Sequence, residues 1–577
     1  MKRAGLPRRQ STDPDGIKLV RSGDSTDSLI VKWRRQVIDS QGWRRRLLAL
    51  CSGLVAVLAL PPLHIVPALV PALTILTWLI EGARQNEIPS RGKRGGTALF
   101  RTGAWSAFAA GWWFGVGFFA AGLYWVSLSF LVDARQFAWM IPFALLGLSG
   151  GFAILIGLST WAAHMSARGK PQRLFVMIAV WWVVFEWVRG WLLTGFPWNY
   201  LGTVWTFSDA ALQLASILGV LGLSLVTMLA AAAPALLGSS ENRGRSSLVI
   251  VGGIYFILAI IWLGGAYRLH LAGDSYLENV RLRLVQPNID QRDKWKAELR
   301  GRHLNNLMSL SEAKVKTYSP THVIWPETAV PFFFDSSPAG LRAVSQVIPK
   351  GGALLTGAPR RSGGKTTDGK NEPTQLWNSF HVLSDQAQIV QTYDKHHLVP
   401  FGEYVPFRNI INVDKLTAGR MDFSPGPGPR ILFVPGAPPV SPLICYEVIF
   451  AGKVAGETGG ESAERPGWLV NVTNDAWFGT SSGPHQHFAA ARLRSVEEGL
   501  PLVRVANTGI SGVIDAYGRV KARSHLNERT FIDSRLPQSL RGPTFYGMYG
   551  DWGVFALMLV VILISIFPHF FLKIQRT

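Results

Sequence analysis

The chain has 577 residues, of which 48% are hydrophobic and 22 are Trp, and its mean hydropathy is +0.19. This composition is too apolar for an ordinary soluble enzyme and indicates a membrane protein. The formal net charge of +21 is compatible with a nucleic-acid surface or a membrane surface, so its distribution along the chain has to decide. The two cysteines, one of them inside an apolar run, form no disulfide framework.

A polar, basic arm is expected at residues 1–46, where 12 Lys and Arg stand against 5 Asp. The arm lacks the small-residue cleavage site of a secretory signal, so the apolar segment after it is expected to remain as an anchor. Its first part is rich in Ser, Asp and Gly, which predicts disorder.

Apolar runs after the arm are candidates for membrane-spanning helices. The eight runs lie at 47–60, 64–80, 104–130, 137–163, 174–195, 210–237, 247–266 and 552–572. The first seven form a predicted transmembrane bundle at 47–270. The eighth belongs to a final segment at 541–577, which ends in a short basic tail.

The loops between these runs alternate in charge. Lys and Arg gather in the loops at 81–103, 165–173 and 238–246, whereas the intervening loops hold almost none. The positive-inside rule then predicts that both chain ends are cytoplasmic and that the segment between the last two spans lies on the outer face. Topology therefore accounts for most of the positive charge, and a nucleic-acid partner is not needed.

The segment at 271–540 has no apolar run of membrane length and is expected to be a separate extracytoplasmic domain. Short β-rich runs alternate there with helical stretches, which indicates an α/β layered fold. The predicted strands lie at 280–285, 321–324, 353–356, 379–383, 389–393, 442–445, 468–472 and 502–505, and the helices at 294–315, 340–348 and 487–498. Two Gly-rich polar insertions, at 360–373 and 452–466, are expected to be loops.

Three predicted strands in this domain end in a titratable residue: Glu327, Lys395 and Cys445. A cysteine alone is most often a small buried hydrophobe. With a base and a cation beside it, however, the thiolate becomes a nucleophile. The three residues are therefore candidates for a covalent catalytic site, with a solvated glutamate and a surface lysine as the alternative interpretations of Glu327 and Lys395.

A metal site is the alternative that the histidines of this domain suggest. His396 and His397 are adjacent, and His485 and His487 are two apart. Adjacent side chains on a strand point to opposite faces, and no cysteine or carboxylate completes a zinc-like set at these spacings. We therefore expect no metal. The triplet at 471–473 matches the glycosylation sequon, a pattern that says little without the host.

Two charged residues fall inside the predicted bundle. Glu186 and Arg189 are three apart on one expected helix and so share a face. Intramembrane charges are usually paired, which favours a structural ion pair over contact with a lipid headgroup. The tryptophan pairs at 112–113 and 181–182 are expected to anchor or pack the helices.

The order Glu, Lys, Cys resembles the nitrilase superfamily. The matching motifs are the Glu after Trp-Pro at 325–327, the Lys of YDKHHLVPFGE at 393–403 and the Cys of ICYE at 444–447. The membrane part narrows this resemblance, because EWVRGWLLTGFPW at 186–198, FGVGFF at 114–119 and QPNIDQ at 286–291 are similar to apolipoprotein N-acyltransferases. Soluble nitrilases have no such helical part.

The resemblance implies a fold and a set of roles. The fold is a membrane α-helical bundle of about eight helices joined to an α/β, nitrilase-like αββα sandwich. Glu327 is implied to be the general base, Lys395 the oxyanion-stabilising partner and Cys445 the nucleophile. The supporting residues implied by the family are Glu403, a second carboxylate near the triad; Tyr446 and Glu447, beside the nucleophile; and Trp295, on a mobile arm near the site opening.

The resemblance also implies a reaction. A fatty acyl chain passes from a membrane phospholipid to Cys445 and then to the α-amine of an S-diacylglyceryl-cysteine on an apolipoprotein, without a cofactor. The expected location is the bacterial inner membrane, and a monomer is expected. Two alternatives remain open: a membrane-anchored amidase that uses water as acceptor, and a transporter or scaffold with an idle outer domain.

Overall fold

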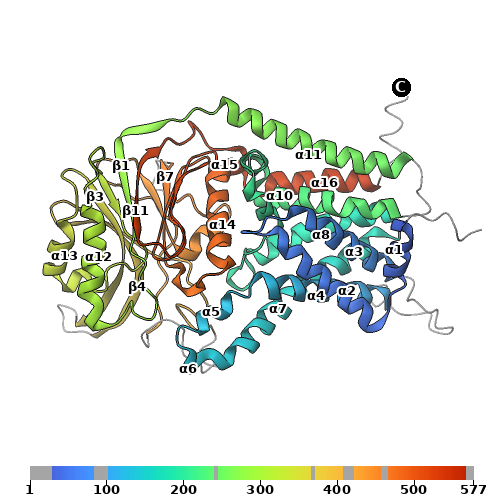
Figure 1. The fold of residues 1–577 in the computed structure, drawn as a ribbon, viewed down its shortest axis with the longest axis horizontal. Helices are drawn as coiled ribbons and strands as arrows, with labels where there is room; N and C mark the ends of the chain where they lie inside the picture. The colour runs from blue at the N-terminus through green and yellow to red at the C-terminus, as the bar shows by residue number, and fades with distance from the viewer. Residues whose placement is uncertain are drawn as a thin grey trace, which may run out of the picture.

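The computed structural model describes residues 29–83, 102–238, 245–365, 371–406, 421–456 and 465–566. A bundle of helices lies beside a sandwich of two β-sheets, with α14 (Ser482–Glu498) between them (Figure 1). The predicted disorder of the first part of the arm lies outside the described residues. Most of the basic loop at 81–103, most of the loop at 238–246 and the basic tail lie outside them as well.

Each of the eight apolar runs contains a helix. The long helices are α2 (Gly42–Ala56), α3 (Leu69–Gly82), α4 (Thr102–Gly122), α7 (Ile141–Ala167), α8 (Pro171–Arg189), α10 (Ala215–Ala232), α11 (Arg245–Leu271) and α16 (Trp552–Ile566). Within the described residues, four helical segments are long and apolar enough to cross a membrane: Ala134–Ala167, Pro171–Arg189, Ala215–Gly238 and Ser246–Leu271. The finer count of eight spans stays a prediction.

The helices pack closely where the sequence places glycine. Gly111 and Gly115 lie on one face of α4, and that face meets α7. A Cβ atom at Gly115 would lie 2.8 Å from Cα of Ala153, and one at Gly111 would collide with Thr160. Small residues of this kind let helix backbones approach within a membrane, where no hydrophobic force drives helices together.

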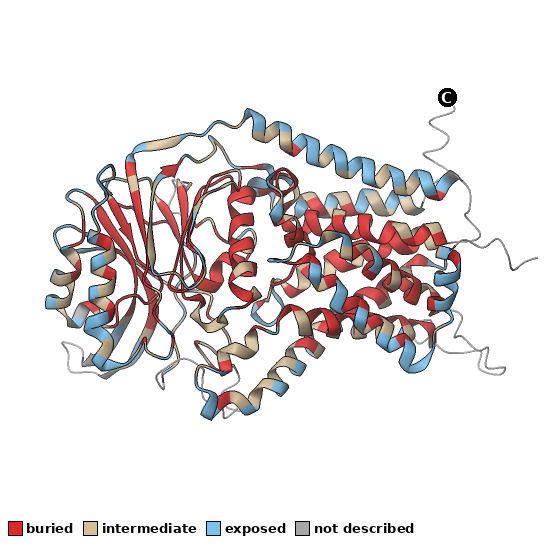
Figure 2. Cartoon of the chain, viewed as in Figure 1, coloured by how far each residue is buried: buried red, intermediate tan, exposed pale blue. Residues whose placement is uncertain are grey.

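The outer surface of the bundle carries exposed apolar side chains. In Figure 2 the ribbon of α11 is coloured largely as exposed or intermediate, whereas α8 and α10 are largely buried. Phe256 and Leu263 on α11 are 66% and 59% exposed. Apolar surface of this extent is rarely left in water, so these faces indicate contact with lipid.

The second half of the basic arm is helical. It forms α1 (Leu29–Ile38), which packs against α3. Arg34 of α1 donates two hydrogen bonds to the carboxylate of Glu81 near the end of α3. Its Nε lies 3.3 Å from Oε2, and its Nη2 bonds Oε1. The arm is therefore tied to the bundle from residue 29 onward.

The sandwich is built from two mixed sheets. The first has the order β11-β1-β2-β3-β4-β5 and the second β10-β9-β8-β7-β6. Their strands are β1 (Tyr276–Gln286), β2 (His322–Ile324), β3 (Ala353–Lys365), β4 (Asn371–Ser384), β5 (Ile389–Asp394), β6 (Val440–Ile444), β7 (Trp468–Thr473), β8 (Leu502–Ala506), β9 (Gly512–Ile514), β10 (Val520–Arg523) and β11 (Thr530–Pro537). All eight predicted strands are confirmed, whereas β9, β10 and β11 were missed.

Alternation along the strands builds the layers. Leu282 and Leu284 of β1 face the second sheet, and Val470 and Val472 of β7 face the first. The opposite face of the first sheet is covered by α12 (Arg300–Glu312) and α13 (Pro338–Ser345), while α14 covers the second (Figure 1). The period of two in the sequence therefore places one apolar core between the sheets and one behind each.

The prediction of a loop at 360–373 is wrong for its described part. Strands β3 and β4 continue into it as a long hairpin, in which Arg360 pairs with Trp377. The guanidinium of Arg360 lies 3.9 Å from the centre of the Trp377 ring and 2.6 Å from Asp394 Oδ2. Cross-strand packing of this kind outweighs the low strand preference of Gly and polar residues. The insertion at 452–466 is described only at its two ends.

Gln486, near the start of α14, joins the sandwich to the bundle. Its Oε1 accepts hydrogen bonds from the indole nitrogens of Trp125, at 3.1 Å, and Trp198, at 2.8 Å. Its Nε2 lies 3.4 Å from the carbonyl of Pro61. One buried amide therefore holds three separate segments of the membrane part.

We expect Gln486→Ala to lower the melting temperature of the full chain in detergent by several degrees. The substitution leaves two buried indole N–H groups without an acceptor, and each such group costs about 1–3 kcal/mol. Gln346→Ala, at an exposed amide after α13, is the control and should leave the melting temperature unchanged. A Gln486→Ala protein that melts with the parent would contradict this role.

Candidate active site

The three predicted residues meet at one edge of the sandwich. Glu327 lies three positions after β2, Lys395 directly follows β5, and Cys445 directly follows β6. The first two therefore come from one sheet and the third from the other. All three are buried, and Lys395 is only 1% exposed. The ends of parallel strands β1–β3 and β6–β8 are where α/β folds usually place their sites.

Lys395 lies between two carboxylates. Its Nζ is 2.8 Å from Glu403 Oε2 and 3.9 Å from Glu327 Oε1. The side-chain nitrogen of Asn378, on β4, bridges the same two carboxylates, at 2.7 Å from Glu327 and 2.9 Å from Glu403. Burial opposes the charge of Lys395, but the two carboxylates outweigh it and raise its pKa. Lys395 is thus a permanently charged group at neutral pH.

Glu327 has the opposite behaviour. Burial raises the pKa of its carboxyl group, and the nearby Glu403 adds to the effect, while Lys395 works against it. A raised pKa moves a carboxylate toward the range in which it can accept and return a proton at neutral pH. Glu327 is therefore suited to general-base chemistry.

Cys445 sits on a tight turn between β6 and a short 3₁₀ segment. Its φ is +53°, a value that non-glycine residues adopt rarely. The turn is held through the Cys445 carbonyl, which accepts hydrogen bonds from Asn471, at 3.3 Å, and from Nε2 of His487, at 3.2 Å. Burial and the Glu327 charge raise the pKa of the thiol to about 12, so the resting group is a thiol that needs a base.

Glu447 fastens the Lys395 turn to the Cys445 turn. Its Oε1 accepts from the backbone N–H of His396, at 2.9 Å, and from the hydroxyl of Tyr393, at 2.9 Å. Its Oε2 accepts from the backbone N–H of Ile444, at 2.7 Å. Burial alone would raise the pKa of Glu447, but the hydrogen bond and charge of His396 lower it. Glu447 therefore acts as a fixed carboxylate that sets the spacing of the site.

Tyr446 connects the nucleophile's turn to the bundle. Its hydroxyl donates to the carbonyl of Gly195, at 2.8 Å, in the loop after α8. The ring packs at 6.3 Å from Phe196 of the same loop and at 5.1 Å from Phe450. Any movement of this loop is therefore transmitted to the residue after Cys445.

The expected ion pair of Glu186 with Arg189 is not a direct contact: both residues are described and no salt bridge joins them there, but their charges interact through space. Arg189 instead donates to the carbonyls of Phe196 and Trp198, the first at 3.1 Å. Glu186 accepts from the backbone N–H of Leu201, at 2.8 Å. The two charges hold opposite ends of the loop that contacts Tyr446. Backbone groups outcompete the partner side chain because the loop is buried and its polar groups need partners.

A second buried network of polar side chains lies behind Cys445, and the sequence did not predict it. Asp475 Oδ1 lies 2.9 Å from His487 Nδ1, and its Oδ2 accepts from Arg504 at 2.8 Å. Arg504 also bonds Asn471, the residue that holds the Cys445 carbonyl. The signal was present, because Asn471 lies within β7, a strand parallel to β6, and Asp475 lies just beyond its end. The burial of Asn471 inside β7 also removes the sequon from consideration.

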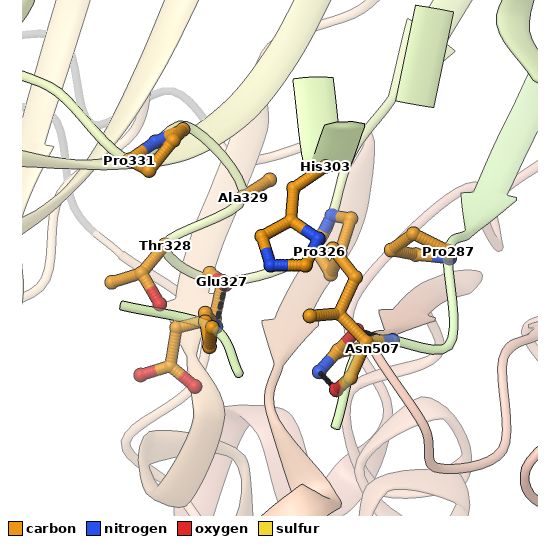
Figure 3. A pocket seen from close by; sticks show the side chains of 10 residues that line it. Pro287, His303, Pro326, Glu327, Thr328, Ala329, Pro331 and Asn507 are labelled. Carbon is orange, nitrogen blue, oxygen red and sulfur yellow. Dashed lines mark hydrogen bonds between the residues drawn. The ribbon is translucent and has the colours of Figure 1, made fainter. Parts of the chain in front are cut away.

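A pocket opens on the Glu327 side of the site. It is small and is lined by residues after β1, β2 and β8 and by α12. Figure 3 shows His303 of α12 lying between Glu327 and Pro287. Lys294, another residue that the sequence did not single out for catalysis, also lines the pocket. Trp295 follows it in the same turn and is half-buried, and its implied role on a mobile arm stays a prediction.

The histidines have partners other than a metal. His396 contacts Glu447 at 2.7 Å, and His397 stacks on Phe450 with ring centres 3.9 Å apart. Within the described ranges, no group of three or more His, Cys, Asp or Glu residues could hold a metal ion.

Comparison with known proteins places this geometry in a family. The model of the apolipoprotein N-acyltransferase N-terminal domain matches residues 52–233, and that of carbon-nitrogen hydrolases matches 281–544. The chain is 37% identical to an apolipoprotein N-acyltransferase of Rhodopseudomonas palustris, over 92% of this chain and 96% of that protein. It is 38% identical to one of Allorhizobium ampelinum, over 91% and 96%.

The chain belongs to the apolipoprotein N-acyltransferase family. The matched N-terminal segment covers the bundle through α10, and the carbon-nitrogen hydrolase segment covers both sheets. The hydrolase match supports the nitrilase-like fold of the sandwich. In this N-acyltransferase family member, the site therefore lies in the hydrolase-type part and is tied by Tyr446 and Gln486 to the part that distinguishes the family.

We expect Gly357→Ala to reduce activity at least tenfold while the protein still folds. Gly357 lies on β3 beside the base, and an added Cβ would lie 2.5 Å from the backbone nitrogen of Thr328 and 2.7 Å from Cα of Glu327. A shift of this size misplaces Glu327, the expected base, relative to the thiol of Cys445, and such a displacement costs orders of magnitude in rate.

Gly301→Ala on α12 is the matched control, since an added Cβ there meets nothing within 4 Å. It should keep full activity. Full activity in Gly357→Ala, measured by acyl-thioester formation on Cys445, would show that the position of Glu327 is not critical.

Proposed function

We propose that this chain transfers a fatty acyl chain from a membrane phospholipid, through a thioester on Cys445, to the α-amine of an S-diacylglyceryl-cysteine at the N-terminus of an apolipoprotein. The observation that carries the proposal is the buried cluster of Glu327, Lys395 and Cys445 in a member of the N-acyltransferase family. The cluster adjoins an apolar helical bundle, as two lipid substrates require. No cofactor is needed.

The first half-reaction loads Cys445. Glu327 takes the thiol proton, and the thiolate attacks the carbonyl carbon of a phospholipid ester. Lys395 and backbone N–H groups stabilise the oxyanion of the tetrahedral intermediate, an effect worth about 3–4 kcal/mol per donor in other acyl-transfer enzymes. The carbon–oxygen bond then breaks, Glu327 returns its proton to the departing alkoxide, and a lysophospholipid leaves.

The second half-reaction transfers the acyl group from Cys445 to the acceptor. The α-amine of the diacylglyceryl-cysteine attacks the thioester carbonyl and gives a proton to Glu327. The carbon–sulfur bond breaks, and Cys445 recovers the proton from Glu327. The product carries an amide-linked third acyl chain. Each half-reaction returns Glu327 to its carboxylate form. Because the lysophospholipid leaves a covalent acyl-enzyme before the acceptor reacts, the sequence is a ping-pong mechanism.

The proposal also includes a topology. Eight spans carry the chain, both ends lie in the cytoplasm, and the catalytic domain at 271–540 lies on the outer face of the inner membrane. The basic loops, the four helices of sufficient length and the exposed apolar faces of the bundle support this arrangement. We further propose that the protein acts as a monomer.

Incubation of the full chain with phospholipid, without an acceptor, should give a fatty acyl thioester on Cys445 that mass spectrometry detects and hydroxylamine removes. Glu327→Gln should lower its formation at least a hundredfold, because the base is lost. Cys51→Ala is the control, since Cys51 lies exposed on α2 and should not affect the thioester.

The acceptor distinguishes this function from an amidase. A diacylated lipopeptide should remove the acyl group from Cys445 far faster than water does and should gain its mass. Absence of a thioester on the parent protein, or release of free fatty acid at the same rate with and without lipopeptide, would overturn the proposal.

A further inference from the structure

Lys294 is a buried cation that the proposed reaction leaves without a role. It is 5% exposed, and its Nζ donates to the backbone carbonyl of Glu327 at 3.1 Å. Its charge interacts with the Glu327 carboxylate and with Cys445. Buried ammonium groups are costly to keep unless charges of opposite sign lie nearby. The environment of Lys294 is therefore the reacting pair itself.

The charges of Glu327, Glu403 and Lys395 balance only when Lys294 is included. Glu327 and Glu403 are two buried carboxylates that share Lys395, and Lys395 is closer to Glu403, at 2.8 Å against 3.9 Å. Two carboxylates around a single cation favour protonation of one of them. A protonated Glu327 could not take the thiol proton. A second cation beside Glu327 removes this difficulty, and Lys294 occupies that position.

We propose that Lys294 is a positioning residue that supplies the second positive charge of the site and so keeps Glu327 in its carboxylate form. The positive charge of Lys294 also stabilises the Cys445 thiolate after the proton has moved to Glu327, because this proton transfer leaves the total charge of the site unchanged. The inference rests on the roles assigned to Glu327 and Cys445 in the proposed function.

The structure holds Lys294 in place through its own turn. The backbone N–H of Lys294 bonds the carbonyl of Asp290 at 3.1 Å. His303 of α12 lies 3.0 Å from the carbonyl of Asp293, and Asn474, after β7, donates to Gln291 at 2.7 Å. One hydrogen bond within the turn and one contact each from α12 and the loop after β7 thus fix the turn that delivers the ammonium group. Trp295 follows on the same turn, so movement of this segment would also move the charge.

The titratable groups around Lys294 are Glu327, Cys445 and, across the pocket, His303. Lys395 and Glu403 lie behind Glu327. Burial lowers the pKa of Lys294 to about 8, while Glu327 and Cys445 act in the opposite direction. At neutral pH the group is thus mostly charged, as the proposed role requires.

The test is the pH dependence of alkylation of Cys445 by iodoacetamide, a neutral reagent, in the full chain in detergent. A Cys51→Ala background leaves Cys445 as the only thiol. Removing a nearby positive charge disfavours both anions, so Lys294→Met should shift the rate profile to higher pH by about one unit or more. At pH 7 this appears as a roughly tenfold loss of rate that higher pH restores.

Two variants separate charge from structure. Lys294→Arg keeps the charge and should restore a profile close to the parent. Lys296→Met removes the same charge two positions away, where the side chain is 49% exposed and pairs with Asp293, and should shift nothing. A purely structural role would lower the rate at every pH without moving the profile.

Superimposable profiles for the parent and Lys294→Met would overturn the inference, and so would an equal shift in Lys296→Met. The outcome is separable from that of the proposed function. Alkylation requires no lipid, so a shifted profile without any acyl thioester would retain the charge balance and reject the acyl transfer. An acyl thioester together with an unshifted pH profile would retain the acyl transfer and reject the charge balance.

Discussion

The structure of the site depends on the cost of burying charge. Lys395, Glu327 and Glu403 are almost completely removed from solvent, and each is tolerated only because the others are within reach. Asn378 bridges the two carboxylates and fixes their separation. The chemistry follows from this arrangement, because the burial that demands pairing also raises the pKa of Glu327 toward the range of a general base. The same burial raises the pKa of the Cys445 thiol, which therefore depends on that base.

The two parts of the chain are connected around this cluster. Tyr446 bonds the loop after α8, and Gln486 binds Trp125 and Trp198. The ring of Trp198 also lies 5.3 Å from that of His487, which contacts the carbonyl of Cys445. A continuous set of packed side chains therefore runs from the bundle to the nucleophile. Under the proposed function this connection gives a physical reason for one chain to contain both parts, because both proposed substrates are lipids held in the membrane.

The sequence predicted the features that a local pattern of residues encodes. Strand alternation and strand ends located Glu327, Lys395 and Cys445, and apolar runs located the helices. It could not show groups whose importance is purely spatial. Asn378 is an unremarkable residue within a strand, and Lys294 stood beside Trp295 without a signal of its own. The hairpin at 360–373 was missed because its stability comes from cross-strand contacts. A direct contact between Glu186 and Arg189 was expected because backbone carbonyls and N–H groups were not counted as competitors.

The most direct test of the central claim is mass spectrometry of a lipoprotein N-terminus in bacteria depleted of their own N-acyltransferase and supplied with this chain. We expect the lipoprotein to carry a third, amide-linked acyl chain with the parent protein and a free α-amine with Cys445→Ala at equal expression. N-acylation restored by Cys445→Ala, or a free α-amine with the folded parent, would contradict it.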